Sequence, residues 1–229
     1  MAVRPVFIPT LSGNVLSITK DLDFPWAPGM AKVQKQKSIR ALHAAANVQG
    51  LAALLEISSK SEDELGVALS AFNLRIKTKK LAKEFTVESA FQASKVFEYG
   101  GPYVDLLYKS SRDAKKDMRL RESGNIIGFK FYDTTWSLIP RTAFYDWLYL
   151  SALNQNKDLA QHLLNFDGFT DIEFNPVKSI NCQARAAALF VSLTKRNMLE
   201  KVLSAQDNFL SILSSHYGVD DFSIQNQLI

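Results

Sequence analysis

The stretch that decides the fold runs from residue 85 to residue 95 and predicts a helix with polar groups on one side: Phe85-Thr86-Val87-Glu88-Ser89-Ala90-Phe91-Gln92-Ala93-Ser94-Lys95. Thr86 suits the N-cap, and an early Glu88 suits the positive end of the helix dipole. We expect the helix over residues 87–97. On it, Glu88, Gln92 and Lys95 follow at i, i+4 and i+7, within roughly 60° of one another at about 100° per residue. Such a stripe suits acid–base and nucleophilic chemistry, although trios like it also arise by chance on helices.

The composition around this stretch favours one folded domain. The chain has 229 residues, of which 47% are hydrophobic and 22% charged, enough to bury a full core. Cys182 is the single cysteine, and there are only three histidines, so we expect no disulfide framework and no metal site. We also expect no cofactor. Without an apolar run of about 18 residues or a signal peptide, we expect the protein to be cytoplasmic.

The pattern along the chain predicts a mainly helical fold with a few short strands. Short β-like runs broken by proline and glycine, followed by a basic helix, predict a small N-terminal appendage over residues 1–50. Residues 51–229 would form the main domain. Within it we expect strands over 67–76 and 170–173, and the longest apolar helix after Pro140.

Basic residues come in runs, although the net charge is only +4. Such runs suit the phosphates of a nucleic acid, but a solvated face is the commoner explanation. The candidates for contact with nucleic acid are Lys35, Lys37, Arg40, Lys77, Lys79 and Lys80.

The order of several motifs resembles the NADAR family, also called YbiA-like, over roughly residues 57–196. The most specific part is the Glu-xxx-Gln-xx-Lys pattern, placed after a block of short strands and before a tryptophan. The whole chain is similar to the NADAR proteins that act as antitoxins beside DarT-type toxins. The matching residues are Ser70, Phe72, Asn73, Glu88, Gln92, Lys95, Ser110, Ser111, Ala114, Trp136, Asp171 and Glu173.

The resemblance implies an enzyme that removes ADP-ribose from guanine bases of DNA and so reverses the toxin. It implies that Lys95 attacks the anomeric carbon of the distal ribose and forms a Schiff base that water hydrolyses, with Glu88 as general acid and base. Ordinary N-glycoside hydrolysis, with Glu88 and either Asp171 or Glu173 as a carboxylate pair, is the competing chemistry. Substrate contacts are expected from Ser70, Phe72, Asn73, Gln92, Trp136, Asp171, Glu173 and Asn181.

The chain also departs from the family pattern. The family usually has Ser-Asn-Phe where this chain has Ser70-Ala71-Phe72-Asn73, and its C-terminal glycine motifs are missing here. Either Asn181, Gln183 or Arg185 replaces the missing groups, or none does. For Trp136 the alternative to stacking on a base is packing in the core, and for Asp171 and Glu173 it is exposure on an edge strand.

A function without chemistry is the alternative. In it the protein binds ADP-ribosylated nucleic acid or the toxin through its basic runs, and affinity falls steeply with salt. Intact Glu88 and Lys95 favour the enzyme.

Overall fold

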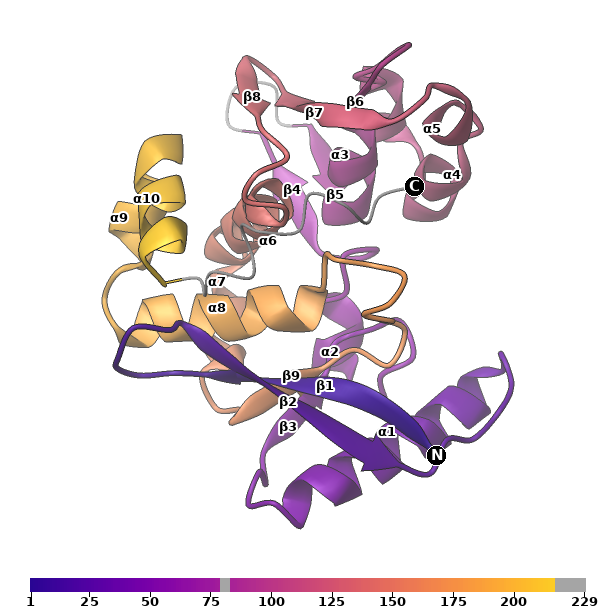
Figure 1. The fold of residues 1–229 in the computed structure, drawn as a ribbon, viewed down its shortest axis with the longest axis vertical. Helices are drawn as coiled ribbons and strands as arrows, with labels where there is room; N and C mark the ends of the chain where they lie inside the picture. Colours follow the sequence, from indigo (N-terminus) through magenta and orange to yellow (C-terminus); the bar gives the residue numbers. More distant parts are fainter. Residues whose placement is uncertain (79–82, 217–229) are drawn as a thin grey trace.

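The computed structural model describes residues 1–78 and 83–216. One half of the molecule is built on a four-stranded sheet in the order β2-β1-β9-β3 (Figure 1). Antiparallel pairing joins β1 to β2 and to β9, whereas β3 runs parallel to β9. The bounds of the four strands are β1 Ala2–Pro9, β2 Ser17–Phe24, β3 Leu54–Glu56 and β9 Gly168–Thr170.

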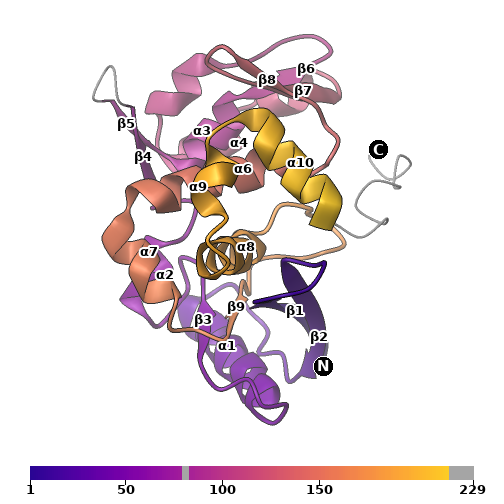
Figure 2. The ribbon, with the colours of Figure 1, turned by 90° about the vertical axis from the view of Figure 1, so that its left-hand side faces the viewer.

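Helices cover both faces of this sheet. Consecutive side chains of a strand point to opposite faces, and β1 has apolar residues on both, so each face needs a covering layer. Val6 joins the cluster that includes Ile39 and Leu42 of α1 (Lys32–Asn47). Its neighbour Phe7 belongs to the main core with α8 (Gln183–Lys195). Figures 1 and 2 show α8 between this sheet and the second half of the molecule.

The second half is built on a three-stranded sheet, formed by β6 (Lys95–Phe97), β7 (Ile126–Phe131) and β8 (Thr134–Trp136). Its inner face packs on α3 (Val87–Ala93) and α6 (Ala143–Gln155) through aromatic rings. The rings of Phe129 and Phe144 stack at 4.8 Å between centroids, and Phe91 lies 5.4 Å from Phe129. Short elements complete the fold: α2 Glu64–Ala68, β4 Arg75–Lys77, β5 Glu84–Thr86, η1 Val104–Tyr108, α4 Ser111–Lys116, α5 Arg119–Glu122, α7 Lys157–Leu163, α9 Leu199–Leu203 and α10 Gln206–His216.

The fold is therefore mixed α/β, and the prediction of a mainly helical chain is only partly right. The strand predicted over 67–76 is wrong in its first part. Residues 67 and 68 belong to α2, which Asp63 caps by accepting a hydrogen bond from the Leu65 N–H. The strand β4 covers only Arg75–Lys77. The strand predicted over 170–173 lies earlier, at Gly168–Thr170.

The N-terminal hairpin is part of the larger sheet, because Phe7 of β1 pairs with Phe169 of β9. The basic helix expected in this region is α1. A boundary at residue 50 between an appendage and the main domain stays a prediction. Among the helices of residues 1–78 and 83–216, none is long and apolar enough to cross a membrane.

Candidate active site

Helix α3 begins where the sequence predicts and ends earlier. Thr86 is the N-cap, and its Oγ1 accepts a hydrogen bond of 3.1 Å from the Ser89 N–H. The helix ends at Ala93, because the Ser94 carbonyl accepts a hydrogen bond of 2.7 Å from the Lys130 N–H and the chain enters the sheet. Lys95 is therefore the first residue of β6, and the helix predicted over 87–97 is wrong in its last turn.

Strand pairing turns Lys95 toward apolar surroundings. It lies directly opposite Phe129 of β7, and cross-strand neighbours share one face of a sheet. Its Nζ lies 5.0 Å from the centre of the Phe91 ring. Burial lowers the pKa of Lys95 to about 8, the Glu88 carboxylate works in the opposite direction, and the Lys115 ammonium lowers it further. A fraction of this amine is thus neutral near pH 7, as a nucleophile requires.

Glu88 and Gln92 form a buried pair next to this lysine. Both are 5% exposed, and the Gln92 Nε2 donates a hydrogen bond of 2.9 Å to the Glu88 Oε1. The Lys115 Nζ lies 3.4 Å from the same oxygen. Glu88 on α3 is near enough to Lys95 on β6 to act on its pKa, although the two residues do not share one helix as predicted. Gln92 orients Glu88 through its hydrogen bond. A contact of Gln92 with ribose hydroxyls stays a prediction.

The turn between α2 and β4 carries three further predicted residues. Ser70 and Asn73 are bound to each other, since the Asn73 Nδ2 donates to the Ser70 Oγ at 3.1 Å and to the Val67 carbonyl at 2.8 Å. Phe72 is half-buried, and its ring lies 5.1 Å from the Lys115 Nζ. Phe72 thus borders the Glu88 site, whereas Ser70 and Asn73 stabilise the turn. Their substrate contacts stay predictions.

Asp171 and Glu173 lie in different surroundings. Asp171 is buried, and its Oδ1 accepts hydrogen bonds from the N–H groups of Glu173 and Phe174 at 3.0 and 3.2 Å. Burial and the Glu56 carboxylate raise the pKa of Asp171 to about 8. Glu173 is exposed and pairs with Lys35 at 3.0 Å.

The loop that follows contains the residues expected to replace missing family motifs. The Asn181 Oδ1 is buried and accepts no hydrogen bond from the described part of the chain, which suits a contact with a ligand. The Gln183 side chain instead bonds the Ala71 N–H and the Ile57 carbonyl, at 2.7 and 2.6 Å. Arg185 bonds the Thr142 hydroxyl at 2.8 Å and pairs with Asp146 at 3.6 Å. Gln183 and Arg185 therefore stabilise the fold around the site.

Tyr145 of α6 is near enough to Glu88 and Asp171 for both carboxylates to act on its pKa, and it is not among the site residues predicted from the sequence. Its ring lies edge-on to Phe91 at 5.2 Å. Burial raises its pKa well above the ordinary value, and Glu88 and Asp171 add to that shift. Both carboxylates are thus near enough to influence this hydroxyl. Its position within an apolar helical run gave no sequence signal.

Trp136 lies in the core, and the stacking prediction is not supported. Its side chain is 1% exposed and packs against Trp147 at 5.2 Å, Phe144 at 5.7 Å and Phe209 at 6.1 Å between centroids. No face of the ring is left for a base. Trp136 is the last residue of β8, and α6 begins seven residues later at Ala143.

The predicted basic contacts fall into three groups. Lys35 and Arg40 already have carboxylate partners, Glu173 and Glu62. Lys37 and Lys77 are exposed. Lys79 and Lys80 lie outside the described residues. Contact of these side chains with nucleic acid stays a prediction.

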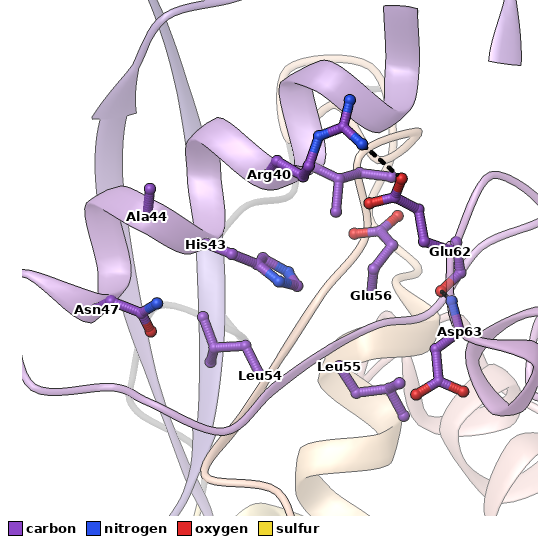
Figure 3. A pocket seen from close by; sticks show the side chains of 11 residues that line it. Arg40, His43, Ala44, Asn47, Leu54, Leu55, Glu56, Glu62 and Asp63 are labelled. Carbon is purple, nitrogen blue, oxygen red and sulfur yellow. Dashed lines mark hydrogen bonds and ion pairs between the residues drawn. The ribbon is translucent and has the colours of Figure 1, made fainter. Parts of the chain in front are cut away.

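A hollow of about 290 Å³ lies between α1 and β3, and it holds none of the predicted catalytic residues (Figure 3). Arg40 and Glu62 pair at its rim at 2.7 Å, and the His43 ring points into it. Beneath, the Thr170 hydroxyl bonds both the His43 Nε2 at 2.9 Å and the Glu56 Oε2 at 2.6 Å. These polar atoms of His43, Thr170 and Glu56 thus have partners within the protein. Residues 1–78 and 83–216 contain no cluster of three or more metal-ligating side chains.

A comparison with family models gives a match over residues 2–221, to the DarT1-associated NADAR antitoxin. The chain belongs to this family. No curated protein matches the chain. Membership in the NADAR antitoxin family confirms the resemblance inferred from the Glu88, Gln92 and Lys95 pattern, and the family's name links the chain to a DarT1 toxin system.

Proposed function

We propose that the protein is an ADP-ribosyl glycohydrolase that removes ADP-ribose from guanine bases of DNA and so acts as an antitoxin against a DarT1 toxin. The observation that carries the proposal is a lysine with a lowered pKa beside a buried carboxylate, in a chain of the NADAR antitoxin family. The geometry suits attack by a neutral amine with a proton-transferring group next to it.

In the proposed reaction the ribose ring opens, its oxygen takes a proton, and an imine joins the anomeric carbon to the guanine nitrogen. The neutral Lys95 amine adds to this carbon. The guanine amine leaves with a proton, and a Schiff base between Lys95 and the ribose remains. Water then adds, the lysine is released, and free ADP-ribose results. One water molecule is consumed and one C–N bond is broken.

Glu88 carries the protons in this scheme, between the ribose oxygen, the leaving nitrogen and the attacking water. Gln92 and Lys115 both bind its Oε1, so its orientation is set before substrate arrives. The competing carboxylate-pair chemistry has less support. Glu173 is paired with Lys35, and Asp171 already accepts two backbone hydrogen bonds.

The test is release of free ADP-ribose from DNA that carries ADP-ribose on guanine. We expect release by the wild type and none by Lys95→Ala. We expect a loss of about 10²- to 10⁴-fold in Glu88→Gln. A folded wild-type protein that releases no ADP-ribose would contradict the proposed enzymatic function. Salt-dependent binding of the modified DNA by that protein would then support a binding function.

A further inference from the structure

Lys115, at the end of α4, contacts the catalytic carboxylate although it is far from it in sequence. Its Nζ lies 3.4 Å from the Glu88 Oε1 and 5.1 Å from the centre of the Phe72 ring. We propose that Lys115 is a positioning residue of this active site, which holds Glu88 by one oxygen and places a second positive charge beside Lys95. This inference rests on the proposed function and adds a residue to its machinery.

A hydrogen-bonded junction explains why the ammonium is in this place. The Ser111 Oγ at the start of α4 donates to the Phe72 carbonyl at 2.8 Å and lies 2.7 Å from the Thr86 Oγ1. Thr86 in turn caps α3, the helix that carries Glu88. Ser111 and Lys115 are four residues apart and share one face of α4. The junction thus fixes α3, α4 and the Phe72 loop relative to one another and directs Lys115 to Glu88.

The first consequence is that the two oxygens of Glu88 differ. Gln92 and Lys115 both approach Oε1. Within residues 1–78 and 83–216, Oε2 receives no hydrogen bond, so it is available to a substrate proton. A carboxylate held by one oxygen keeps its orientation while the other oxygen exchanges protons.

The second consequence concerns the protonation of Lys95. Two charged groups act on its amine: Glu88 on α3 raises its pKa and Lys115 on α4 lowers it. The strand opposite presents the Phe129 ring, and α6 presents Tyr145, whose hydroxyl stays protonated because its pKa is raised. Removing Lys115 takes away a repelling cation and frees Glu88 to attract the Lys95 proton. Both effects raise the pKa of Lys95.

The direct test titrates Lys95 in Lys115→Gln. Lysines are labelled by reductive ¹³C-methylation, and the Lys95 signal is identified by its absence in Lys95→Ala. The matched control is Lys116→Gln, which removes the same charge from the next residue of α4, also exposed. We expect the midpoint to rise by about half to one pH unit in Lys115→Gln and to be unchanged in Lys116→Gln and Lys115→Arg. Equal midpoints in Lys115→Gln and Lys116→Gln would overturn the proposal.

Release of ADP-ribose gives a second readout. At pH 7 we expect Lys115→Gln to be about three- to tenfold slower than Lys116→Gln, and the difference to close at about pH 10, where most of the Lys95 amine is neutral in both. A deficit of the same size at every pH would assign Lys115 to substrate binding and contradict the proposal. If the wild type releases nothing, the proposed function fails, while the titration still decides the role of Lys115.

Discussion

Two buried glutamates of this chain are almost equally inaccessible, and only one of them suits catalysis. Glu88 is 5% exposed and Glu56 is 2% exposed. Both oxygens of Glu56 are occupied, Oε1 by the Ile172 N–H at 2.9 Å and Oε2 by the Thr170 hydroxyl. Among residues 1–78 and 83–216, the two side-chain partners of Glu88 both approach its Oε1, and one of them is the Lys115 ammonium.

The difference teaches that burial alone does not mark an active site. Glu56 joins β3 to β9 and to the chain after it through its two hydrogen bonds, so it stabilises the four-stranded sheet. Burial raises its pKa, which disfavours the charged form. Glu88 lies near an amine whose pKa is lowered, and its Oε2 accepts no hydrogen bond from the described residues. A reactive carboxylate needs both a free atom and a neighbouring charge.

The largest expected effect is on the rate in Glu88→Gln. The amide keeps the shape of the side chain and removes its proton transfer, so release of ADP-ribose falls about 10²- to 10⁴-fold while the melting temperature changes little. Glu56→Gln is the matched control and should keep its rate within about threefold. A rate loss in Glu56→Gln as large as that in Glu88→Gln would break the comparison.

Next in size is the loss of stability in Glu56→Ala. The Thr170 hydroxyl and the Ile172 N–H lose their acceptor in a buried place, which costs about 2–4 kcal/mol of unfolding free energy. Urea denaturation measures this cost. An unchanged midpoint would show that the Glu56 hydrogen bonds do not stabilise the sheet.

The pH dependence of stability is smaller and comes from Asp171. Its pKa is about 8 in the folded chain and 3.8 ordinarily, so the folded state keeps a proton that the unfolded state has lost. Stability conferred by this proton decreases as the pH rises. Burial lowers the pKa of His43 from 6.5 to about 4, so between these two pH values its contribution to the unfolding free energy rises with pH. From pH 6.5 to 8 the unfolding free energy should therefore fall by up to about 2 kcal/mol.

The matched variant for this slope is Asp171→Asn, which keeps an oxygen for the Glu173 and Phe174 N–H groups. Urea denaturation at pH 6.5 and pH 8 should show a flatter dependence in this variant. A slope equal to that of the wild type would assign the proton to another group, such as Glu56, whose pKa is also raised and whose carboxylate acts on Asp171.

The smallest effect is expected from Thr86→Ala. It removes the N-cap of α3 and the bond to Ser111, which costs about 1–2 kcal/mol of unfolding free energy. Because the same hydroxyl fixes α4, the rising limb of the pH–rate profile should also move toward the one for Lys115→Gln. A profile identical to that of the wild type would mean that the junction does not position Lys115.

Local features of the site were predictable from the sequence, and long-range ones were not. Thr86 was recognised as an N-cap, and the spacing of Glu88, Gln92 and Lys95 predicted their proximity. The end of α3 was missed because it depends on pairing of Lys95 with Phe129, which is 34 residues away. Only the strand register shows that Lys95 faces the aromatic rings.

The same limit applies to side chains whose sequence context fits more than one role. Lys115 belongs to a basic segment and has no feature that separates it from Lys116, so its contact with Glu88 follows only from the packing of α4 on α3. Trp136 had two possible roles, and its neighbours Trp147, Phe144 and Phe209 come from later parts of the chain. The roles of Lys115 and Trp136 therefore depend on tertiary packing, which the sequence pattern does not show.

The central claim, that Lys95 is the nucleophile, is tested most directly by reduction with borohydride during turnover. With guanine-ADP-ribosylated DNA, the account predicts a stable ADP-ribose adduct that peptide mass spectrometry places on Lys95 and that is absent from Lys95→Ala. Full release of ADP-ribose by the wild type, with no adduct trapped on Lys95, would contradict it.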